Sequence, residues 1–140
     1  MTPFPQRLFC DTSFFYACLD PKDRNHEMAL ALLTEAQVVE ARFYTTWDIV
    51  SETVTLLRYR KNYQTAKRFL VDIKPSLHIV WHGDGVHQEA EEIFCKFGNE
   101  RRLSFCDSIS CVVVTTLLDH MPCLAFDEDF RKLGLTIIFP

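Results

Sequence analysis

The chain lacks an uninterrupted apolar run of the roughly 20 residues needed to cross a bilayer. Residues 1–7 do not form a basic segment followed by an apolar core, which is the pattern of a signal peptide. These absences predict a cytoplasmic protein with no membrane association.

Short motifs with a defined chemistry are also missing. Neither G-x-x-x-x-G-K-[ST] nor G-x-G-x-x-G occurs, which argues against a nucleotide-cradling loop. The chain has 6 cysteines but no C-x-x-C pair, and most of these cysteines lie within apolar runs. We therefore expect buried thiols rather than disulfides or a zinc site.

Length and composition indicate one globular domain over residues 1–140. The hydrophobic fraction of 48% and the charged fraction of 24% are ordinary for such a domain. The net charge of -4 does not mark a nucleic-acid-binding protein. It is compatible with an acidic enzyme that holds phosphate through metal ions and a few local cations.

Short, continuously apolar runs alternate with segments of helical periodicity. This alternation predicts an α/β fold with a buried parallel sheet between two layers of helices. The expected strands cover residues 7–11, 42–45, 77–81, 123–126 and 135–139. The expected helices cover residues 13–19, 25–40, 46–60, 62–74, 86–97, 105–118 and 127–133.

The first expected strand ends in Asp11, which Thr12 and Ser13 follow. In open parallel α/β sheets, ligands bind just beyond the carboxyl ends of the strands. Asp11 is therefore a candidate catalytic or ligand residue. Taken alone, it is equally explained as a turn residue or a helix cap.

Three further carboxylates belong to the same candidate site. Glu52 falls at the edge of an apolar helical stripe, although a boundary glutamate with a solvated head has the same pattern. Asp107 stands three residues after Ser104, which also fits a capping box. The helix that contains Asp107 is apolar on nearly all of its faces, so we expect its first turn to be buried in the protein interior. Asp127 ends a strand as Asp11 does, and Asp129 can share or replace its role.

Four acids gathered at one place would repel one another. A hard divalent cation such as Mg²⁺ or Mn²⁺ relieves this repulsion, because these ions prefer oxygen ligands and keep water and phosphate in their shell. Such a site supports metal-assisted attack on phosphorus without a nucleophilic side chain.

The motifs around these acids resemble those of the PIN domain family, whose members are metal-dependent ribonucleases. Many small bacterial and archaeal members are the toxins of VapBC toxin–antitoxin pairs. The matching pieces are Phe9-Cys10-Asp11-Thr12-Ser13, Ser51-Glu52-Thr53, Leu103-Ser104-Phe105-Cys106-Asp107-Ser108 and Ala125-Phe126-Asp127-Glu128-Asp129-Phe130. Their order and spacing fit the family over essentially the whole chain.

The resemblance implies a five-stranded parallel sheet in the order 3-2-1-4-5, with Asp11 beside Asp127. It implies that Asp11, Glu52, Asp107 and Asp127 hold Mg²⁺ or Mn²⁺, with the choice between Asp127 and Asp129 open. Thr12 or Ser13 then contacts substrate or a bound water. The family also suggests a homodimer and an antitoxin partner whose tail fills the acidic groove.

Two basic segments are candidate RNA contacts. Residues 58–63 mix cations with tyrosines, and Arg101 and Arg102 precede the Asp107 helix. Either segment can instead be a solvated turn.

His78, His82 and His87 share no helical face, which argues against zinc. Apolar surface around residues 14–16 is a candidate for dimerisation or for a partner helix.

The function that these features favour is an endoribonuclease of the toxin type that cleaves single-stranded RNA. Hydrolysis by an activated water would leave a 5′-phosphate. Two alternatives remain open at this point: a PIN-fold module that binds RNA or protein without turnover, and a metal-dependent phosphatase or phosphoacceptor domain on a similar sheet.

Overall fold

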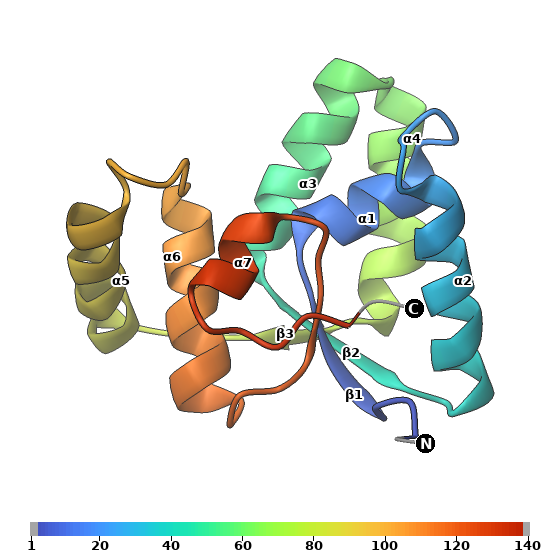
Figure 1. Cartoon of the computed structure of the whole chain (residues 1–140). Helices are drawn as coiled ribbons and strands as arrows, with labels where there is room; N and C mark the ends of the chain where they lie inside the picture. The colour runs from blue at the N-terminus through green and yellow to red at the C-terminus, as the bar shows by residue number, and fades with distance from the viewer. Residues whose placement is uncertain (1–2, 139–140) are drawn as a thin grey trace.

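A parallel four-stranded sheet in the order β3-β2-β1-β4 forms the centre of the molecule (Figure 1). The structure is a computed structural model that describes residues 3–138. The strands are β1 (Arg7–Cys10), β2 (Arg42–Thr46), β3 (His78–Val80) and β4 (Cys123–Leu124). From β1 the chain adds β2 and then β3 on one side, and β4 pairs with the other side of β1, so the strand order reverses between β1 and β4. Crevices open at such a switch point.

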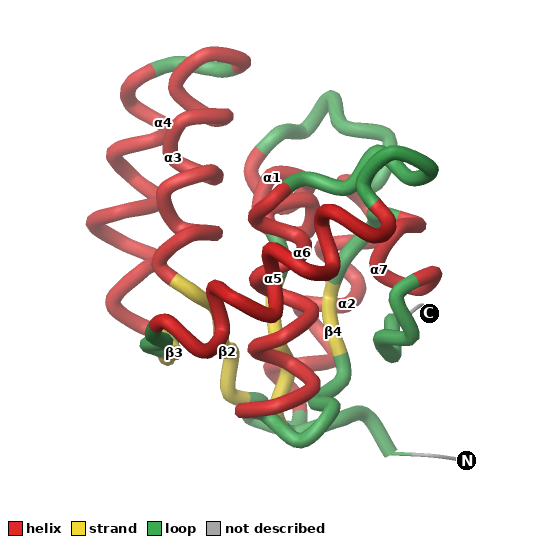
Figure 2. The backbone as a smooth tube through the Cα atoms, turned by 90° about the vertical axis from the view of Figure 1, so that its left-hand side faces the viewer, coloured by secondary structure: helices red, strands yellow, loops and turns green. Residues whose placement is uncertain are grey.

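The helices pack in two groups. The first group contains α1 (Thr12–Leu19), α2 (His26–Val38), α3 (Trp47–Arg60) and α4 (Tyr63–Arg68): α1 packs on both α2 and α3, and α3 packs on α4. In the second group, α5 (Asp84–Phe97) packs on α6 (Phe105–Val112). Figure 1 shows α5 and α6 on one side of the sheet and α1 and α2 on the other, and Figure 2 shows α3 beside α4. The predicted three-layer α/β/α architecture is confirmed.

Shorter helical segments complete the chain. They are the π-helical turns η1 (Phe69–Ile73) and η3 (Val113–Leu117), the 3₁₀ turn η2 (Lys74–Ser76) and the helix α7 (Glu128–Lys132). The two helices expected over 62–74 and 105–118 therefore each change to a wider turn before they end. Among residues 3–138, no helix is both long and apolar enough to span a membrane.

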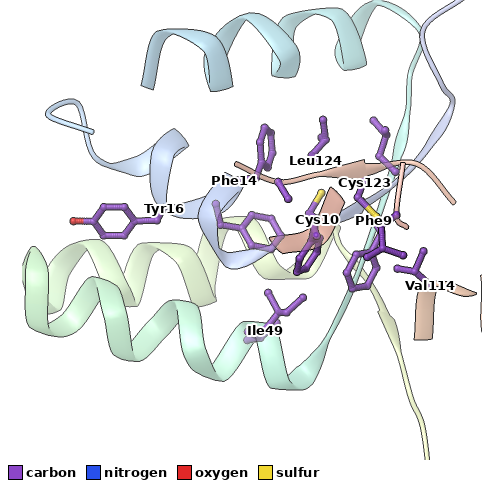
Figure 3. Close-up of a cluster of buried hydrophobic side chains, with 14 of the residues drawn as sticks. Phe9, Cys10, Phe14, Tyr16, Ile49, Val114, Cys123 and Leu124 are labelled. Carbon is purple, nitrogen blue, oxygen red and sulfur yellow. The ribbon is translucent and has the colours of Figure 1, made fainter. Parts of the chain in front are cut away.

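The core is built around β1. Leu8, Phe9 and Cys10 are fully buried, and Phe9 pairs with Tyr44 of β2 on one side and with Cys123 of β4 on the other. Figure 3 shows Phe9 and Cys10 among the side chains of this cluster. A strand buried on both faces reads as continuously apolar, and this is how the sequence revealed it.

The fifth strand, expected over 135–139, is reduced to a single parallel bridge between Cys123 and Ile137. Cys123 donates its N–H to the Thr136 carbonyl at 2.8 Å, and Ile138 donates to the Cys123 carbonyl at 3.0 Å. The segment runs in the expected place, but β4 is only two residues long and offers no further ladder partners. Phe139 lies outside the described residues.

The apolar surface expected around residues 14–16 is not exposed, so that prediction is wrong. Phe14, Phe15 and Tyr16 are 2%, 5% and 8% exposed. The Phe15 ring packs on Phe69 with centroids 5.2 Å apart, because η1 covers this face of α1. A partner cannot dock on these three side chains without unpacking the core.

Candidate active site

A cavity of about 380 Å³ lies at the carboxyl ends of the strands. Asp11, Glu52, Asp107 and Asp127 all line it, although they are far apart in the sequence. Asp129 does not line it. The parallel sheet brings the ends of β1 and β4 together, and α3 and α6 contribute the other two acids.

Asp11 is the most deeply buried of these acids, at 4% exposure. It caps α1, and its Oδ2 accepts hydrogen bonds from the Ser13 N–H at 3.1 Å and the Ser13 hydroxyl at 2.7 Å. Its Oδ1 is buried and has no hydrogen-bond partner among the residues described. Burial, with a smaller contribution from the charge of Glu52, raises the pKa of Asp11 to about 6.

Asp107 is 6% exposed and forms a capping box with Ser104. The Ser104 N–H donates to Asp107 Oδ2 at 3.2 Å, and the Asp107 N–H donates to Ser104 Oγ at 3.0 Å. Burial raises the pKa of Asp107 to about 7, and the charges of Asp11 and then Asp127 contribute to this rise. The capping interpretation is correct, yet the carboxylate also lines the acidic cavity.

Asp127 occupies the position on α7 that Asp11 occupies on α1. It is the N-cap, and its Oδ1 accepts the Asp129 backbone N–H at 2.9 Å. Burial is the main cause that raises the pKa of Asp127. Since Asp129 supplies its backbone to this cap and its side chain is not in the cavity lining, we favour Asp127 as the fourth acid of the candidate site.

Glu52 projects from the middle of α3 and is half-buried. The next residue, Thr53, is fully buried, and its hydroxyl donates to the Thr12 hydroxyl at 3.3 Å. This contact links α3 to the start of α1 beside Asp11. Thr12 and Ser13 both line the cavity, and their contact with substrate or a bound water stays a prediction.

The candidate cationic residues separate into two groups. Arg102 lines the cavity, and Arg60, from the basic segment 58–63, lines it as well. Arg101 does not: its Nη1 donates to the Lys132 carbonyl at 3.0 Å, and its guanidinium lies 5.0 Å from the Phe97 ring centroid. Arg101 thus holds the 98–104 loop against α7 and is outside the cavity lining, and its contact with RNA stays a prediction.

Tyr16 is a cavity residue that the sequence interpretation missed. Its ring lies 5.9 Å from the Arg60 guanidinium, and its hydroxyl donates to Asp20 Oδ2 at 2.7 Å. Lys61 Nζ lies 3.4 Å from Asp20 Oδ1. Figure 3 shows Tyr16 extending away from the apolar cluster. Its position one helical turn after Thr12 is the signal that would have placed it near the site.

Two of the three histidines meet, and the third lies apart from them. His82 Nε2 lies 2.7 Å from Asp48 Oδ2, and its ring meets the His87 ring edge-on at 4.9 Å. His78 instead stacks on Tyr44.

The acidic residues suit a hard cation with an open shell. Asp11 Oδ1 is a buried carboxylate oxygen without a protein partner, and the other acids offer oxygen donors around the same cavity. Within residues 3–138, no three acidic, histidine or cysteine side chains are close enough to form a complete ligand cage. Mg²⁺ does not require such a cage, since it commonly keeps several waters and binds one or two carboxylates directly.

Comparison with known proteins agrees with this geometry. The profile of the PIN domain family matches residues 8–135, a span that includes all four acids. The chain belongs to the PIN domain family. The resemblance inferred from the short motifs is thereby confirmed.

Individual relatives place this PIN domain near the VapC group. It is 33% identical over 125 residues to a VapC ribonuclease of Archaeoglobus fulgidus, an alignment that covers 86% of this chain and 76% of the relative. Its fold matches Mycobacterium tuberculosis VapC20, a Sarcin-Ricin loop cleaving toxin, with a TM-score of 0.80 and 24% identity over 95% of this chain and 99% of that one.

A second solved structure shares the PIN fold at lower identity. FitAcB from Neisseria gonorrhoeae matches with a TM-score of 0.70 and 14% identity, over 94% of this chain and 96% of that chain. At these identities the two solved structures inform on the fold alone.

Proposed function

We propose that this PIN domain is a metal-dependent endoribonuclease and the toxin of a type II toxin–antitoxin pair. The observation that carries the proposal is the buried, unpartnered Asp11 Oδ1 in a cavity that Asp107, Glu52 and Asp127 also line. The relationship to a VapC ribonuclease supports the choice of RNA as substrate.

Asp11 and Asp107 hold the cation in this proposal. Burial makes their charged forms costly, so each gains from binding either a proton or a divalent ion at neutral pH. Glu52 and Asp127, which line the same cavity, supply the remaining carboxylate oxygens. When bound, Mg²⁺ or Mn²⁺ supplies Lewis acidity and lowers the pKa of a coordinated water.

Substrate positioning falls to the cations and hydroxyls of the cavity. Arg60 and Arg102 provide guanidinium groups that can bind phosphate oxygens of the RNA backbone in pairs of hydrogen bonds. Tyr16 restricts Arg60 by lying against its guanidinium. Thr12 and Ser13 offer hydroxyls next to Asp11 for contacts with substrate or water.

The same electrostatics suit an inhibitory antitoxin. A cavity lined by four acids attracts a basic peptide tail, which would displace the cation and block the phosphate contacts.

We also propose a homodimer, as the family resemblance implies. The contact face in such a dimer is not the buried set Phe14, Phe15 and Tyr16.

The deciding experiment is a ribonuclease assay of the wild-type protein beside Asp11→Asn, with Mn²⁺ and with excess EDTA. We expect cleavage only by the wild type with the metal, and products that carry 5′-phosphates. Asp129→Asn is the matched control, because it removes one carboxylate outside the cavity. A 2′,3′-cyclic phosphate product, or cleavage in EDTA, would contradict the proposal.

A PIN module that binds RNA without turnover gives a different pattern. In that case wild type and Asp11→Asn bind RNA with similar affinity, and neither cleaves it at high protein concentration in Mn²⁺. Activity on small phosphate esters instead of RNA would indicate the phosphatase alternative.

A further inference from the structure

A second hollow, of about 420 Å³, lies beside the acidic cavity. Glu52 lines both, so the two hollows adjoin at this side chain. The other lining residues of the second hollow are Trp47, Asp48, Ser51, Phe105, Cys106 and Ile109. The acidic cavity therefore adjoins a surface with large aromatic side chains.

Trp47 lines this hollow, and Trp81 lies against Trp47. The parallel register pairs Thr46 with Val80, so the next residues, Trp47 and Trp81, emerge side by side from β2 and β3. Their rings are stacked, with centroids 6.4 Å apart and planes inclined by 24°. Trp47 is 45% exposed and Trp81 is 74% exposed. So much exposed indole surface at the mouth of a site suggests a ligand with flat apolar faces.

A contact between neighbouring residues holds together the two segments that carry the tryptophans. The residues that follow each tryptophan, Asp48 and His82, are joined by a bond of 2.7 Å between Oδ2 and Nε2. The His82 side chain is only 8% exposed. This contact ties the turn after β3 to the first turn of α3, so little conformational entropy remains to be lost when a ligand stacks there.

A cation accompanies the aromatic surface. Lys74 Nζ lies 5.1 Å from the ring centroid of Trp47. An aromatic face beside an ammonium group matches a nucleotide, whose base stacks and whose phosphate is an anion. Asp48, a carboxylate that lines the same hollow, is paired with His82, which reduces its repulsion of a phosphate.

We propose that Trp47 and Trp81 form a stacking platform for a nucleobase of the RNA, adjacent to the phosphate held in the acidic cavity. The platform rests on the proposed function and extends it to the substrate: it selects unpaired nucleotides, because a base inside a duplex cannot present its face. Stacking of this kind tolerates any base, so sequence preference must come from other contacts.

The chain's 2 tryptophans both belong to the platform, so intrinsic fluorescence reports on it directly. The experiment uses the Asp11→Asn protein, because this substitution limits cleavage of the RNA. A short single-stranded RNA of mixed sequence is titrated into this protein with Mn²⁺ present. We expect the indole emission to change as RNA binds and a labelled RNA to give the same affinity by anisotropy. Trp81→Ala should bind roughly 5- to 100-fold more weakly, the range for losing one base–aromatic stack.

Two further variants separate stacking from a general surface effect. Trp81→Phe keeps a ring and should recover most of the affinity. Leu117→Ala should bind as tightly as the parent. Leu117 is 49% exposed, and its neighbour Leu118 lines a hollow together with Arg7, the first residue of β1. Leu117 therefore lies near the start of β1, whereas the tryptophans follow the ends of β2 and β3. Equal thermal unfolding midpoints among the variants would show that folding is not the cause.

The outcomes separate this proposal from the nuclease proposal. Cleavage by the wild type with a KM that Trp81→Ala leaves unchanged overturns the platform and keeps the nuclease. RNA binding that depends on Trp81, without any cleavage, overturns the nuclease and keeps the platform. Emission that responds to protein concentration but not to RNA would assign the pair to an interface between copies and overturn the platform.

Discussion

The Ser13 hydroxyl links Asp11, at the end of β1, to the segment that follows β4. This hydroxyl donates to Asp11 Oδ2 at 2.7 Å and accepts the Phe126 backbone N–H at 2.9 Å. Phe126 immediately precedes Asp127, so one small side chain fixes the ends of β1 and β4 relative to each other. The orientation of the free Asp11 Oδ1 depends on this arrangement.

Ser13→Ala should therefore impair catalysis more than binding. Loss of the hydroxyl removes the hydrogen bond that it donates to Asp11 Oδ2 and the one that it accepts from the Phe126 N–H, so the Asp11 carboxylate is held less firmly. We expect kcat to fall roughly 10- to 100-fold with little change in KM, as for other residues that orient metal ligands. The free energy of unfolding should fall by about 1–2 kcal/mol. Steady-state kinetics and chemical denaturation measure the two effects.

Ser13→Thr supplies the control for that prediction, because it keeps a hydroxyl at the same position. It should retain far more activity than Ser13→Ala. Equal activity of all three proteins would mean that Ser13 does not orient Asp11.

Stability without metal should depend on pH through Asp11 and Asp107. Their folded pKa values of about 6 and about 7 lie above the value of about 3.9 expected in an unfolded chain. Their contribution to stability is fully present below about pH 4 and is lost as the pH rises through 6 and 7. In EDTA, we expect the unfolding free energy to decrease by roughly 1–3 kcal/mol between pH 5 and pH 8.

Denaturation at several pH values with and without Mn²⁺ tests this prediction. Mn²⁺ should remove most of the decrease, because the bound ion compensates the buried charges. Asp107→Asn keeps a side-chain acceptor for the Ser104 N–H and should be more stable than wild type at pH 8 in EDTA. An equally steep pH dependence in Asp107→Asn would show that other groups cause it.

Asp127→Asn and Asp129→Asn should behave differently. The Asp127 side chain lines the cavity, whereas Asp129 contributes its backbone N–H to the cap. Asp127→Asn should weaken Mn²⁺ binding and lower kcat by roughly 10- to 100-fold, while Asp129→Asn should change either by about twofold or less. Calorimetric titration with Mn²⁺ and a cleavage assay compare them. The reverse ranking would place Asp129 in the site.

Arg60→Gln should weaken RNA binding, and Arg101→Gln should not. Arg60 lines the cavity against Tyr16, whereas Arg101 bonds the Lys132 carbonyl outside it. Loss of a charged contact to phosphate should raise KM roughly tenfold and reduce the salt dependence of binding. KM measured at several salt concentrations tests both variants. If Arg101→Gln gave the larger rise in KM, the RNA path would have to run over the 98–104 loop.

Local patterns in the chain determined the fold class and the candidate acids. Continuous apolar runs marked β1 and β2, and capping residues such as Ser104 and Asn62 fixed where helices begin. Asp11 and Asp127 could be recognised because a carboxylate directly after a buried strand lies at a known edge of a parallel sheet. The family motifs then supplied the strand order.

Long-range packing decided what the patterns left open. The expected fifth strand is a single bridge because its partner β4 is short. Residues 14–16 belong to the core because η1 covers this face of α1. Arg101 and Arg102 are adjacent in the sequence, yet only Arg102 lines the cavity. Trp47 and Trp81 meet only through the register of β2 and β3.

The sequence by itself determined which acids are candidates for the chemistry, since a buried strand, a helix cap and an acid can each be recognised from a few neighbouring positions. Only the tertiary structure decided which of them share a cavity and which face away. The reason is that burial and the distance between side chains depend on segments far apart in the chain, and these in turn set the raised pKa values of Asp11 and Asp107.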